Sequence, residues 1–392
     1  MSPMPSKENM NILHLLSWFP TPEDPTLGNF CLRMIGALPE TCHSVVLAVG
    51  EREGIARPYT LQETHEHGYT LVRVESRPAS FPLLRRFRKW RMYQKGLAYL
   101  KERNFQPDLL HLHVAWPLGR IALAWHRRYG YPYLLTEHWS IYLPQNQKLL
   151  KGRLKRQIVR IAQNAALILP VSRNLQQNME RIGIRQPYRV IHNVVDTSLF
   201  QPNKTAERAA KKQLLHVSTL QDEVKNFSGI LRVVERLRQQ RDDFELHVIH
   251  DYDASRFQAF VREHGLEGNV FFHGKKNPEE VAGAYAAADC FVLFSHFETL
   301  SCVLLEAFAA GIPVLATAVG GIPEIVSPER GLLVPDGDEE ALLQALIQML
   351  DTCRDYDREA IRRYAVENFS ENIIGQQLSE AYRSVLKEKQ RC

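Results

Sequence analysis

One stretch of the sequence, residues 290–326, constrains the fold more than any other. It runs CFVLFSHFETLSCVLLEAFAAGIPVLATAVGGIPEIV. CFVLF and VLAT are short apolar runs, which are typical of strands buried on both faces of a parallel sheet. Between them, Ser301 can cap a helix, Gly311 suits the left-handed position after its end, and Pro313 prevents its continuation. The stretch therefore predicts one parallel β-α-β unit whose ligand site lies beyond the carboxyl ends of its strands.

Two glutamates, Glu298 and Glu306, lie in this unit with seven residues between them. Glu298 falls in the loop before the helix. Glu306 falls inside CVLLEAFAA, a helix that is apolar all round and therefore buried, where an ionised carboxylate is costly without partners. Sugar hydroxyls are suitable partners, and the helix N-terminus near Ser301 can hold a phosphate. The alternative is an internal ion pair for Glu306 and a solvated Glu298.

The order of these motifs closely resembles the donor-binding segment of the retaining family-4 glycosyltransferases (glycosyl transferases group 1) of the GT-B fold. Their pattern is E-x7-E, then G-x-P-V-(I/L)-A-(T/S), then GG-x-x-E-(I/L)-(I/V), which matches GIPVLAT and GGIPEIV here. The resemblance implies an α/β protein with two Rossmann-like domains that face a central cleft. Residues 10–195, with a C-terminal helix over 370–390 packing back on them, are expected on the acceptor side. Residues 196–369 are expected to bind the nucleotide sugar.

The N-terminal half predicts a Rossmann-like α/β domain by itself, because short apolar runs alternate with helix-length segments. It lacks G-x-G-x-x-G, which disfavours an NAD enzyme. Gly28 and Asn29 precede the first expected helix, where a glycine lets the backbone approach a phosphate; a surface turn shaped by the neighbouring prolines is the alternative. His138, in TEHWS, follows a strand. In the family that the chain resembles, a histidine in the matching segment contacts the donor sugar, whereas a bond to the backbone is the ordinary role of such a residue.

The second domain departs from the family pattern in its first loop, where the expected arginine is replaced and one residue is inserted before the lysine. YRVIHNVVDTSLF resembles the family's link between domains, and LLHVSTLQDEVKN stands where V-G-R-L-x-x-x-K-G is usual. Lys225 and Asn226 match the lysine position that grips the donor diphosphate, but Thr219 replaces the expected arginine. A hydroxyl cannot supply a bidentate, charged clamp, so Lys225 acts alone or an arginine reaches in from elsewhere. The backbone at Gly274 is suited to the nucleobase.

The length of 392 residues fits two domains, and the absence of an apolar run of about 18 residues predicts no membrane-spanning helix. The six cysteines form no C-x-x-C pair, which favours reduced thiols in a cytoplasmic protein over disulfides or a structural zinc site. No D-x-D stands in a fitting loop, since Asp251 and Asp253 are the nearest instance. We therefore expect no metal and no cofactor.

Charge is distributed unevenly. Residues 1–200 carry 27 Lys and Arg against 14 Asp and Glu, a balance of +13, whereas the whole chain has a net charge of +5. The basic half contains LLRRFRKWRMYQK, which predicts either a helix on an anionic membrane surface or a solvated helix packed through Phe87, Trp90 and Leu97. Nucleic acid is not an expected partner, because no recognisable nucleic-acid-binding module accompanies the charge.

The expected function is retaining transfer of a hexosyl group from a UDP- or GDP-linked donor to a saccharide or lipid-linked saccharide, in cell-surface polysaccharide or glycolipid synthesis. The protein is expected in the cytoplasm or at the inner face of the membrane. A GT-B sugar-nucleotide epimerase and a non-catalytic donor-binding subunit are the alternatives. The resemblance implies that the catalytic residues are His138, Glu298 and Lys225, and that the donor is bound by Gly28, Asn29, Thr219, Lys225, Asn226, Gly274, Glu298, Thr299, Leu300, Ser301 and Glu306.

Overall fold

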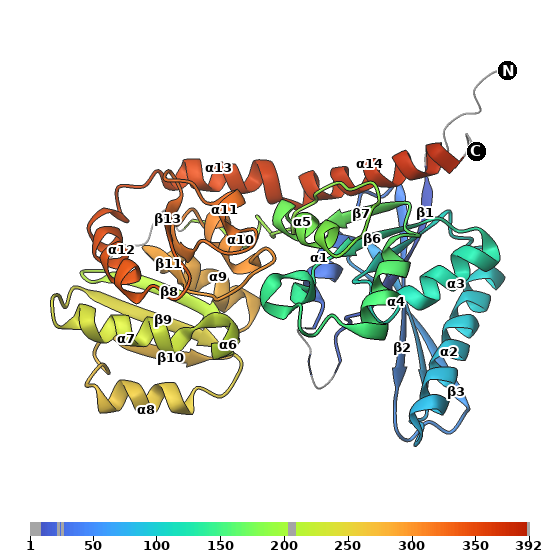
Figure 1. The fold of residues 1–392 in the computed structure, drawn as a ribbon, viewed down its shortest axis with the longest axis horizontal. Helices are drawn as coiled ribbons and strands as arrows, with labels where there is room; N and C mark the ends of the chain where they lie inside the picture. Colours follow the sequence, from blue (N-terminus) through green and yellow to red (C-terminus); the bar gives the residue numbers. More distant parts are fainter. Residues whose placement is uncertain (1–8, 22–23, 25–26, 203–208, 390–392) are drawn as a thin grey trace. The chain divides into compact units, whose positions relative to one another are not determined.

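The computed structural model describes residues 9–21, 24, 27–202 and 209–389. The chain divides into two compact units, each built on one sheet (Figure 1). Unit 1 comprises Met1–Val171, Gln176–His192 and Ile374–Cys392, and unit 2 comprises Ser172–Leu175 and Asn193–Ile373.

Unit 1 contains a seven-stranded sheet in the order β3-β4-β2-β1-β5-β6-β7. All neighbouring strands are parallel except β3 and β4, which form an antiparallel hairpin at one edge. The sequence does not predict β3, because its residues, YTLQETHE, none of which is buried, give no apolar signal. The strands are β1 (Met10–Leu16), β2 (Cys42–Glu51), β3 (Tyr59–Glu66), β4 (Tyr69–Ser76), β5 (Leu109–His113), β6 (Tyr133–Glu137) and β7 (Leu167–Pro170).

The C-terminal helix α14 packs against the sheet of unit 1. Tyr382 of this helix contacts His111 of β5 through its hydroxyl, and Gly375 lies so close to the carbonyl of Ala37 that a Cβ would not fit. The helix is described as far as Lys389, so residue 390 of the expected helix lies outside the described residues. The helices of this unit are α1 (Asn29–Gly36), α2 (Pro82–Glu102), α3 (Gly119–Tyr129), α4 (Gly152–Ala162) and α14 (Glu371–Lys389), with short 3-10 turns at Ser140–Tyr142 and Pro144–Asn146, while α5 (Arg173–Arg181) begins in unit 2.

Unit 2 contains a six-stranded parallel sheet in the order β10-β9-β8-β11-β12-β13. Side chains of α7 and α12, such as Phe227 and Leu346, form its core with Phe244 and Leu246 of β9. The strands are β8 (Lys212–Ser218), β9 (Phe244–His250), β10 (Val270–Gly274), β11 (Cys290–Leu293), β12 (Val314–Thr317) and β13 (Gly331–Val334). The helices are α6 (Asp222–Lys225), α7 (Phe227–Arg238), α8 (Ser255–Glu263), α9 (Pro278–Ala287), α10 (Cys302–Ala309), α11 (Ile322–Ile325), α12 (Glu339–Thr352) and α13 (Arg358–Phe369).

The strand order reverses once in each sheet, beside β1 and β5 in unit 1 and beside β8 and β11 in unit 2. In open α/β sheets, ligands bind outside the carboxyl ends of the strands at such points. Backbone strain occurs there as well: Val114 follows β5 with φ 62°, and Leu220 follows β8 with φ 55°. Neither residue type adopts a positive φ readily, and strain of this kind clusters at functional loops. Each unit therefore has one edge at which a site is expected.

The first turns of α2, a helix that packs on β2 and β4, expose large apolar side chains. Leu83 is 79% exposed and Phe87 is 60% exposed. The alternative in which Phe87 packs inward is therefore wrong, although Leu97 of the same helix is buried as that alternative requires. Across the described ranges, no helix is both long and apolar enough to cross a membrane.

Candidate functional site

The loops that follow β8 and β11 of unit 2 are joined by a largely buried ion pair. The Lys225 ammonium donates to Glu298 Oε1 at 2.5 Å, and the hydroxyl of Ser295 donates to the same oxygen at 3.0 Å. The N–H of His296 donates to the carbonyl of Val224 at 2.8 Å, which fixes one loop against the other. Neither side chain is solvated, so the alternatives that placed Glu298 and Lys225 in solvent are wrong.

A pair of glycines holds the Glu298 loop in place. Gly320 has φ 55°, and a Cβ on it would lie 1.6 Å from the carbonyl oxygen of Glu298. The N–H of Gly321 donates to the carbonyl of Thr299 at 3.2 Å. Only glycine permits so close an approach of two backbones, which gives the GG motif a physical reason.

The next two carbonyls of this loop are engaged by segments far away in the sequence. The Ser172 hydroxyl donates to the carbonyl of Thr299 at 2.9 Å, and the Asn193 amide donates to the carbonyl of Leu300 at 3.1 Å. Both contacts lie within unit 2. Thr299 and Leu300 thus help to hold the loop that carries Glu298 through their backbone carbonyls.

Helix α10 begins as the sequence predicts, with one correction. Ser301 is its N-cap residue, but the side chain makes no capping hydrogen bond. Glu306 is only 7% exposed in the middle of the helix, which confirms the expected burial. Gly311 follows the helix with φ 71°, in the left-handed region that the sequence predicts for it. The first turn of α10 therefore points its N–H groups toward the loop that carries Glu298, and no Ser301 hydroxyl occupies them.

Three other predicted donor-binding residues lie at the same edge of unit 2, at different distances from the ion pair. Asn226 directly follows Lys225 and adopts φ 46°, so asparagine takes the left-handed conformation at the position where the family has glycine. Thr219 is half-buried in the loop after β8, beside the strained Leu220. Gly274 ends β10, which β9 separates from β8. The structure therefore groups Asn226 and Thr219 with Lys225 but leaves Gly274 two strands away.

In unit 1, Gly28 lies at the start of α1, in the loop after β1, and His138 directly follows β6. Gly28 has φ 76°, and a Cβ on it would lie 2.3 Å from the carbonyl oxygen of Trp18, so the turn into α1 requires glycine. Asn29 is the first residue of that helix. His138 is buried, and its ring packs on Phe30 of α1 with centroids 4.5 Å apart. The structure thus brings His138 to the N-terminal turn of α1.

A buried carboxylate that the sequence analysis missed fixes the segment around His138. Glu137 accepts hydrogen bonds from the N–H groups of Ala115, His138 and Trp139, each at 3.0 Å, and from the Tyr142 hydroxyl at 2.8 Å. Burial raises the pKa of Glu137, while these four bonds act in the opposite direction. A charged residue at the end of an apolar strand was the available signal for this role.

Three buried histidines lie beneath this segment. His14 Nδ1 and His113 Nε2 are 3.3 Å apart, and His111 bonds to Tyr382 and Thr136 through its two ring nitrogens. Burial lowers the pKa of all three histidines well below the usual value, so they are neutral. Ligand atoms of His14, His111 and His113 lie within 4.8 Å of one another. Because both ring nitrogens of His111 are already hydrogen-bonded, a core role accounts for the cluster.

Comparisons with known proteins bear on both units. The model of the family described as Glycosyltransferase Family 4 matches residues 27–199, and the model described as Glycosyl transferases group 1 matches residues 198–367. The MMP alpha-(1->4)-mannosyltransferase of Mycolicibacterium hassiacum is 26% identical over 304 residues, which cover 73% of this chain and 72% of the relative.

A second relative, TuaC of Bacillus subtilis (strain 168), is named for teichuronic acid biosynthesis. It is 28% identical over 262 residues, and the match spans 64% of this chain and 63% of the relative, less than two thirds of its length. Among solved structures, Anabaena Alr3699/HepE in complex with UDP superposes with a TM-score of 0.73 over 96% of this chain and all of that chain, at 18% identity. At that identity the likeness shows the fold.

Proposed function

Because the chain belongs to the glycosyltransferases of group 1 and family 4 and has their GT-B fold of two Rossmann-like α/β units, we propose that it is a retaining hexosyltransferase. Its donor is a UDP- or GDP-linked sugar, and its acceptor is a saccharide or a lipid-linked saccharide. The observation that carries the proposal is the buried pair of Lys225 and Glu298 at the point where the strand order of unit 2 reverses. The relatives named for mannosyl transfer and for teichuronic acid biosynthesis support a role in polysaccharide or glycolipid synthesis.

Lys225 is proposed to bind the donor diphosphate. An ammonium group carries three N–H donors, and Glu298 accepts one of them, which leaves the others for phosphate oxygens. The N–H groups of the first turn of α10 add positive potential on the same side. Lys225 thus performs alone the task that the family shares between an arginine and a lysine, because Thr219 carries no charge. UDP in the similar Anabaena structure supports a nucleotide donor here.

Glu298 is proposed to orient the donor sugar, and Glu306 to bind the ribose hydroxyls. In the reaction, the bond between the anomeric carbon and the diphosphate breaks. The acceptor oxygen bonds to the same face of that carbon, and its proton passes to the departing diphosphate. The developing negative charge on the diphosphate is stabilised by fixed donors, which is the largest single contribution in reactions of this kind. His138 is proposed to orient the sugar from unit 1.

No metal is proposed for this reaction. The nearest D-x-D, at Asp251 and Asp253, lies after β9, and Asp253 accepts hydrogen bonds from the N–H and the hydroxyl of Ser255 at the start of α8. The Asp253 carboxylate therefore stabilises the turn at the start of α8. The ammonium of Lys225 supplies the positive charge that a metal supplies in metal-dependent transferases.

The exposed start of α2 is proposed to contact an anionic membrane. Leu83 and Phe87 stand four residues apart, on one helix face, and Arg88 and Arg91 flank them on the same helix. Apolar side chains interleaved with cations are typical of helices that lie in a membrane interface. Replacing Leu83 and Phe87 by serine is expected to abolish co-sedimentation with vesicles containing phosphatidylglycerol. The control is Leu149→Ser, which changes another exposed leucine elsewhere in unit 1.

Nucleotide release tests the proposal. Purified protein is incubated without metal with a panel of UDP- and GDP-hexoses, and wild type is compared with Lys225→Ala and Glu298→Ala. Slow release of one nucleoside diphosphate, lost in both variants, is the expected result. Conversion of the free sugar nucleotide to an epimer, without release, would identify an epimerase. Binding of one nucleotide with no turnover under any acceptor would identify a donor-binding subunit.

A further inference from the structure

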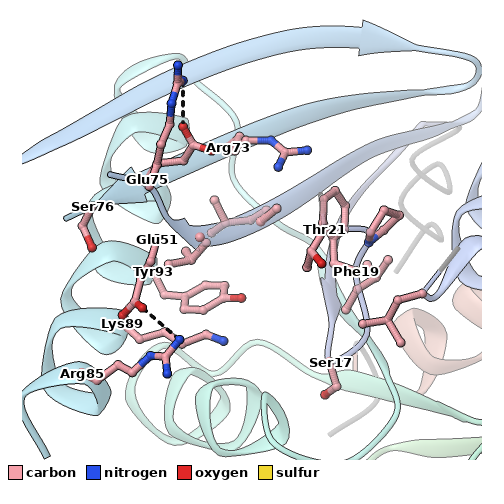
Figure 2. A pocket seen from close by; sticks show the side chains of 18 residues that line it. Ser17, Phe19, Thr21, Glu51, Arg73, Glu75, Ser76, Arg85, Lys89 and Tyr93 are labelled. Carbon is pink, nitrogen blue, oxygen red and sulfur yellow. Dashed lines mark hydrogen bonds and ion pairs between the residues drawn. The ribbon is translucent and has the colours of Figure 1, made fainter. Parts of the chain in front are cut away.

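A cavity of about 790 Å³ lies in unit 1 at the carboxyl ends of β1, β2 and β4 (Figure 2). Its walls are the segment Ser17–Thr21 after β1, the ends of β2 and β4, and one face of α2. Leu27 also lines the cavity, and the next residue, Gly28, begins the turn into α1. The cavity therefore shares the β1–α1 loop with the segment that packs against His138.

The charges that line this cavity do not cancel. Among the residues that the structure describes, four cations and two carboxylates face it, and each of these carboxylates is already in an ion pair. Glu51 pairs with Arg85 at 2.9 Å, and Glu75 pairs with Arg52 at 3.5 Å. For Arg73 and Lys89, no carboxylate lies within ion-pair distance among the residues that the structure describes. Two cations of the same cavity are thus left to a ligand.

Figure 2 shows that the side chains of Arg73 and Lys89 extend into the cavity from opposite walls, with the hydroxyl of Tyr93 between them. Arg73 comes from β4, and its guanidinium lies 5.2 Å from the centroid of the Phe19 ring. Lys89 and Tyr93 come from neighbouring turns of α2. A planar guanidinium and a compact ammonium on opposite sides of one space are the donor set that binds phosphate oxygens.

The local environment of Lys89 favours an anionic ligand. The pKa of its ammonium is lowered, first by desolvation and then by the neighbouring Arg85, while the Glu51 carboxylate acts in the opposite direction. Lys89 is an exposed residue, so an anion can reach its ammonium, and a bound anion offsets the effects of desolvation and of Arg85. A neutral sugar hydroxyl would leave them in place, and an apolar ligand would make them worse. The charge balance, the geometry and the environment of Lys89 point to the same class of ligand.

We propose that this cavity binds a phosphate or diphosphate group of the acceptor, held by Arg73 and Lys89, with Tyr93 as an additional donor. This assignment rests on the proposed glycosyl transfer and names the chemical class of its acceptor. Two sources share that chemistry: the phosphate of a lipid-linked saccharide and the phosphate of a soluble sugar phosphate. Phe81 is an exposed apolar side chain one turn before Arg85, which lines the cavity.

Titration calorimetry with inorganic phosphate and with farnesyl phosphate tests the assignment. Wild type is compared with Arg73→Gln, Lys89→Gln and the double variant. The control is Arg86→Gln, which removes one positive charge from the same helix at a residue that does not line the cavity. Removal of either cation is expected to weaken phosphate binding about tenfold or more, because each is a charged donor to the anion. The control is expected to bind phosphate as wild type does. Circular dichroism and the melting temperature show whether each variant is folded.

The outcomes separate this assignment from the proposed function. Equal phosphate affinity in wild type and in the folded double variant would overturn the cavity assignment, whatever the nucleotide panel shows. Phosphate binding that depends on Arg73 and Lys89 would support it even if no nucleotide sugar were turned over. Because the diphosphate site of unit 2 also attracts phosphate, Lys225→Gln is titrated in parallel, and the component that depends on Arg73 is expected to persist there. Tighter binding of farnesyl phosphate than of inorganic phosphate would identify the lipid-linked source, and equal binding would identify the soluble one.

Discussion

The two units use different interactions to hold the loops at the carboxyl ends of their strands. In unit 2, the loops after β8 and β11 meet through two charged groups, Lys225 and Glu298, 2.5 Å apart. In unit 1, the corresponding edge is held by hydrogen bonds. The buried histidines there are neutral, and the Glu137 carboxylate accepts bonds from N–H and O–H donors. A cation fixed in a largely buried ion pair suits a diphosphate, because a diphosphate needs cations. A carboxylate held by neutral N–H and O–H donors suits the fixing of the loop that places His138.

The units also differ in how loop rigidity is achieved. Unit 2 relies on glycine, since the backbone at Gly320 passes against the carbonyl of Glu298. Unit 1 relies on side-chain acceptors, since Glu137 ties Ala115 to the segment after β6. We therefore expect variants of unit 2 to lose catalysis first and variants of unit 1 to lose stability and positioning first.

The largest effect is expected for Glu298→Gln. The amide keeps the shape of the side chain but removes the negative charge beside Lys225, so the turnover number should fall about a hundredfold to a thousandfold. The melting temperature should also fall, because Lys225 keeps a largely buried charge without its partner. Steady-state nucleotide release measures the turnover number. The matched control is Glu280→Gln, which neutralises the partner of Lys276 in a surface pair of α9. An unchanged turnover number in Glu298→Gln would remove the charged pair from the mechanism.

The next effect is expected for a substitution of Gly320, which supports the loop that carries Glu298. Gly320→Ala places a methyl group against the Glu298 carbonyl at a positive φ, and it should destabilise unit 2 by about 3 kcal/mol. Urea unfolding measures this loss. Gly283→Ala is the control, because it lies in α9 with open space around the added Cβ, and it should stabilise by about 0.5–1 kcal/mol. Similar effects of both substitutions would show that the approach of the two backbones is unimportant.

In unit 1, Glu137→Gln is expected to cost about 2–3 kcal/mol of unfolding free energy, because the amide nitrogen faces N–H groups that lose their acceptor. Tyr142→Phe removes a single hydrogen bond to the same carboxylate and should cost about 1 kcal/mol. The substrate KM should rise in Glu137→Gln, as His138 loses its support, and should stay nearly unchanged in Tyr142→Phe. Equal costs for the two variants would mean that the backbone donors of the network contribute nothing.

The last prediction concerns a difference in acid sensitivity. The folded-state pKa values of His14, His111 and His113 are well below the unfolded value of about 6.5, so the unfolded chain binds more protons below that pH. Stability should therefore fall below about pH 6.5, by about 1.4 kcal/mol per pH unit for each histidine. Glu137, with its raised pKa, opposes this trend. In unit 2, His216 has its pKa lowered to about 4.

Hydrogen exchange measured at pH 7.5 and pH 5.5 tests whether unit 1 is more sensitive to acid than unit 2. Amides of β1, β5 and β6 should lose protection at the lower pH before those of β8 and β11 do. Loss of protection in unit 2 first would contradict the assignment of the acid-sensitive groups to unit 1.

The sequence correctly predicted part of the local structure at the site of unit 2. Glu298, Glu306 and Gly311 lie within one short stretch, and its apolar runs and turn residues predicted the buried β-α-β unit that carries them. The GG pair was identified through the family resemblance. Burial of Glu306 is confirmed, and Ser301 is in place at the N-cap without its expected hydrogen bond. These features are local, and local patterns are visible in a single sequence.

The features that the sequence did not predict depend on distant contacts. Glu137 binds an N–H group 22 residues away, and the Gly320 contact with Glu298 joins two loops that nothing in their composition pairs. The cavity that exposes Arg73 and Lys89 exists only because β4 and α2 are brought together. Strand β3 has no apolar alternation, since its residues face solvent at a sheet edge. Each of these features depends on tertiary contacts, which the periodicity of the sequence does not reveal.

Binding of UDP and GDP to Lys225→Met tests the central claim most directly, because the claim is that this ammonium in unit 2 holds the donor diphosphate. Isothermal titration of wild type should detect one of the two nucleotides, and Lys225→Met should bind it about tenfold more weakly or worse. Lys276→Met, which removes a surface ammonium from the same unit, should bind as wild type does. Equal affinity in wild type and a folded Lys225→Met would contradict the account.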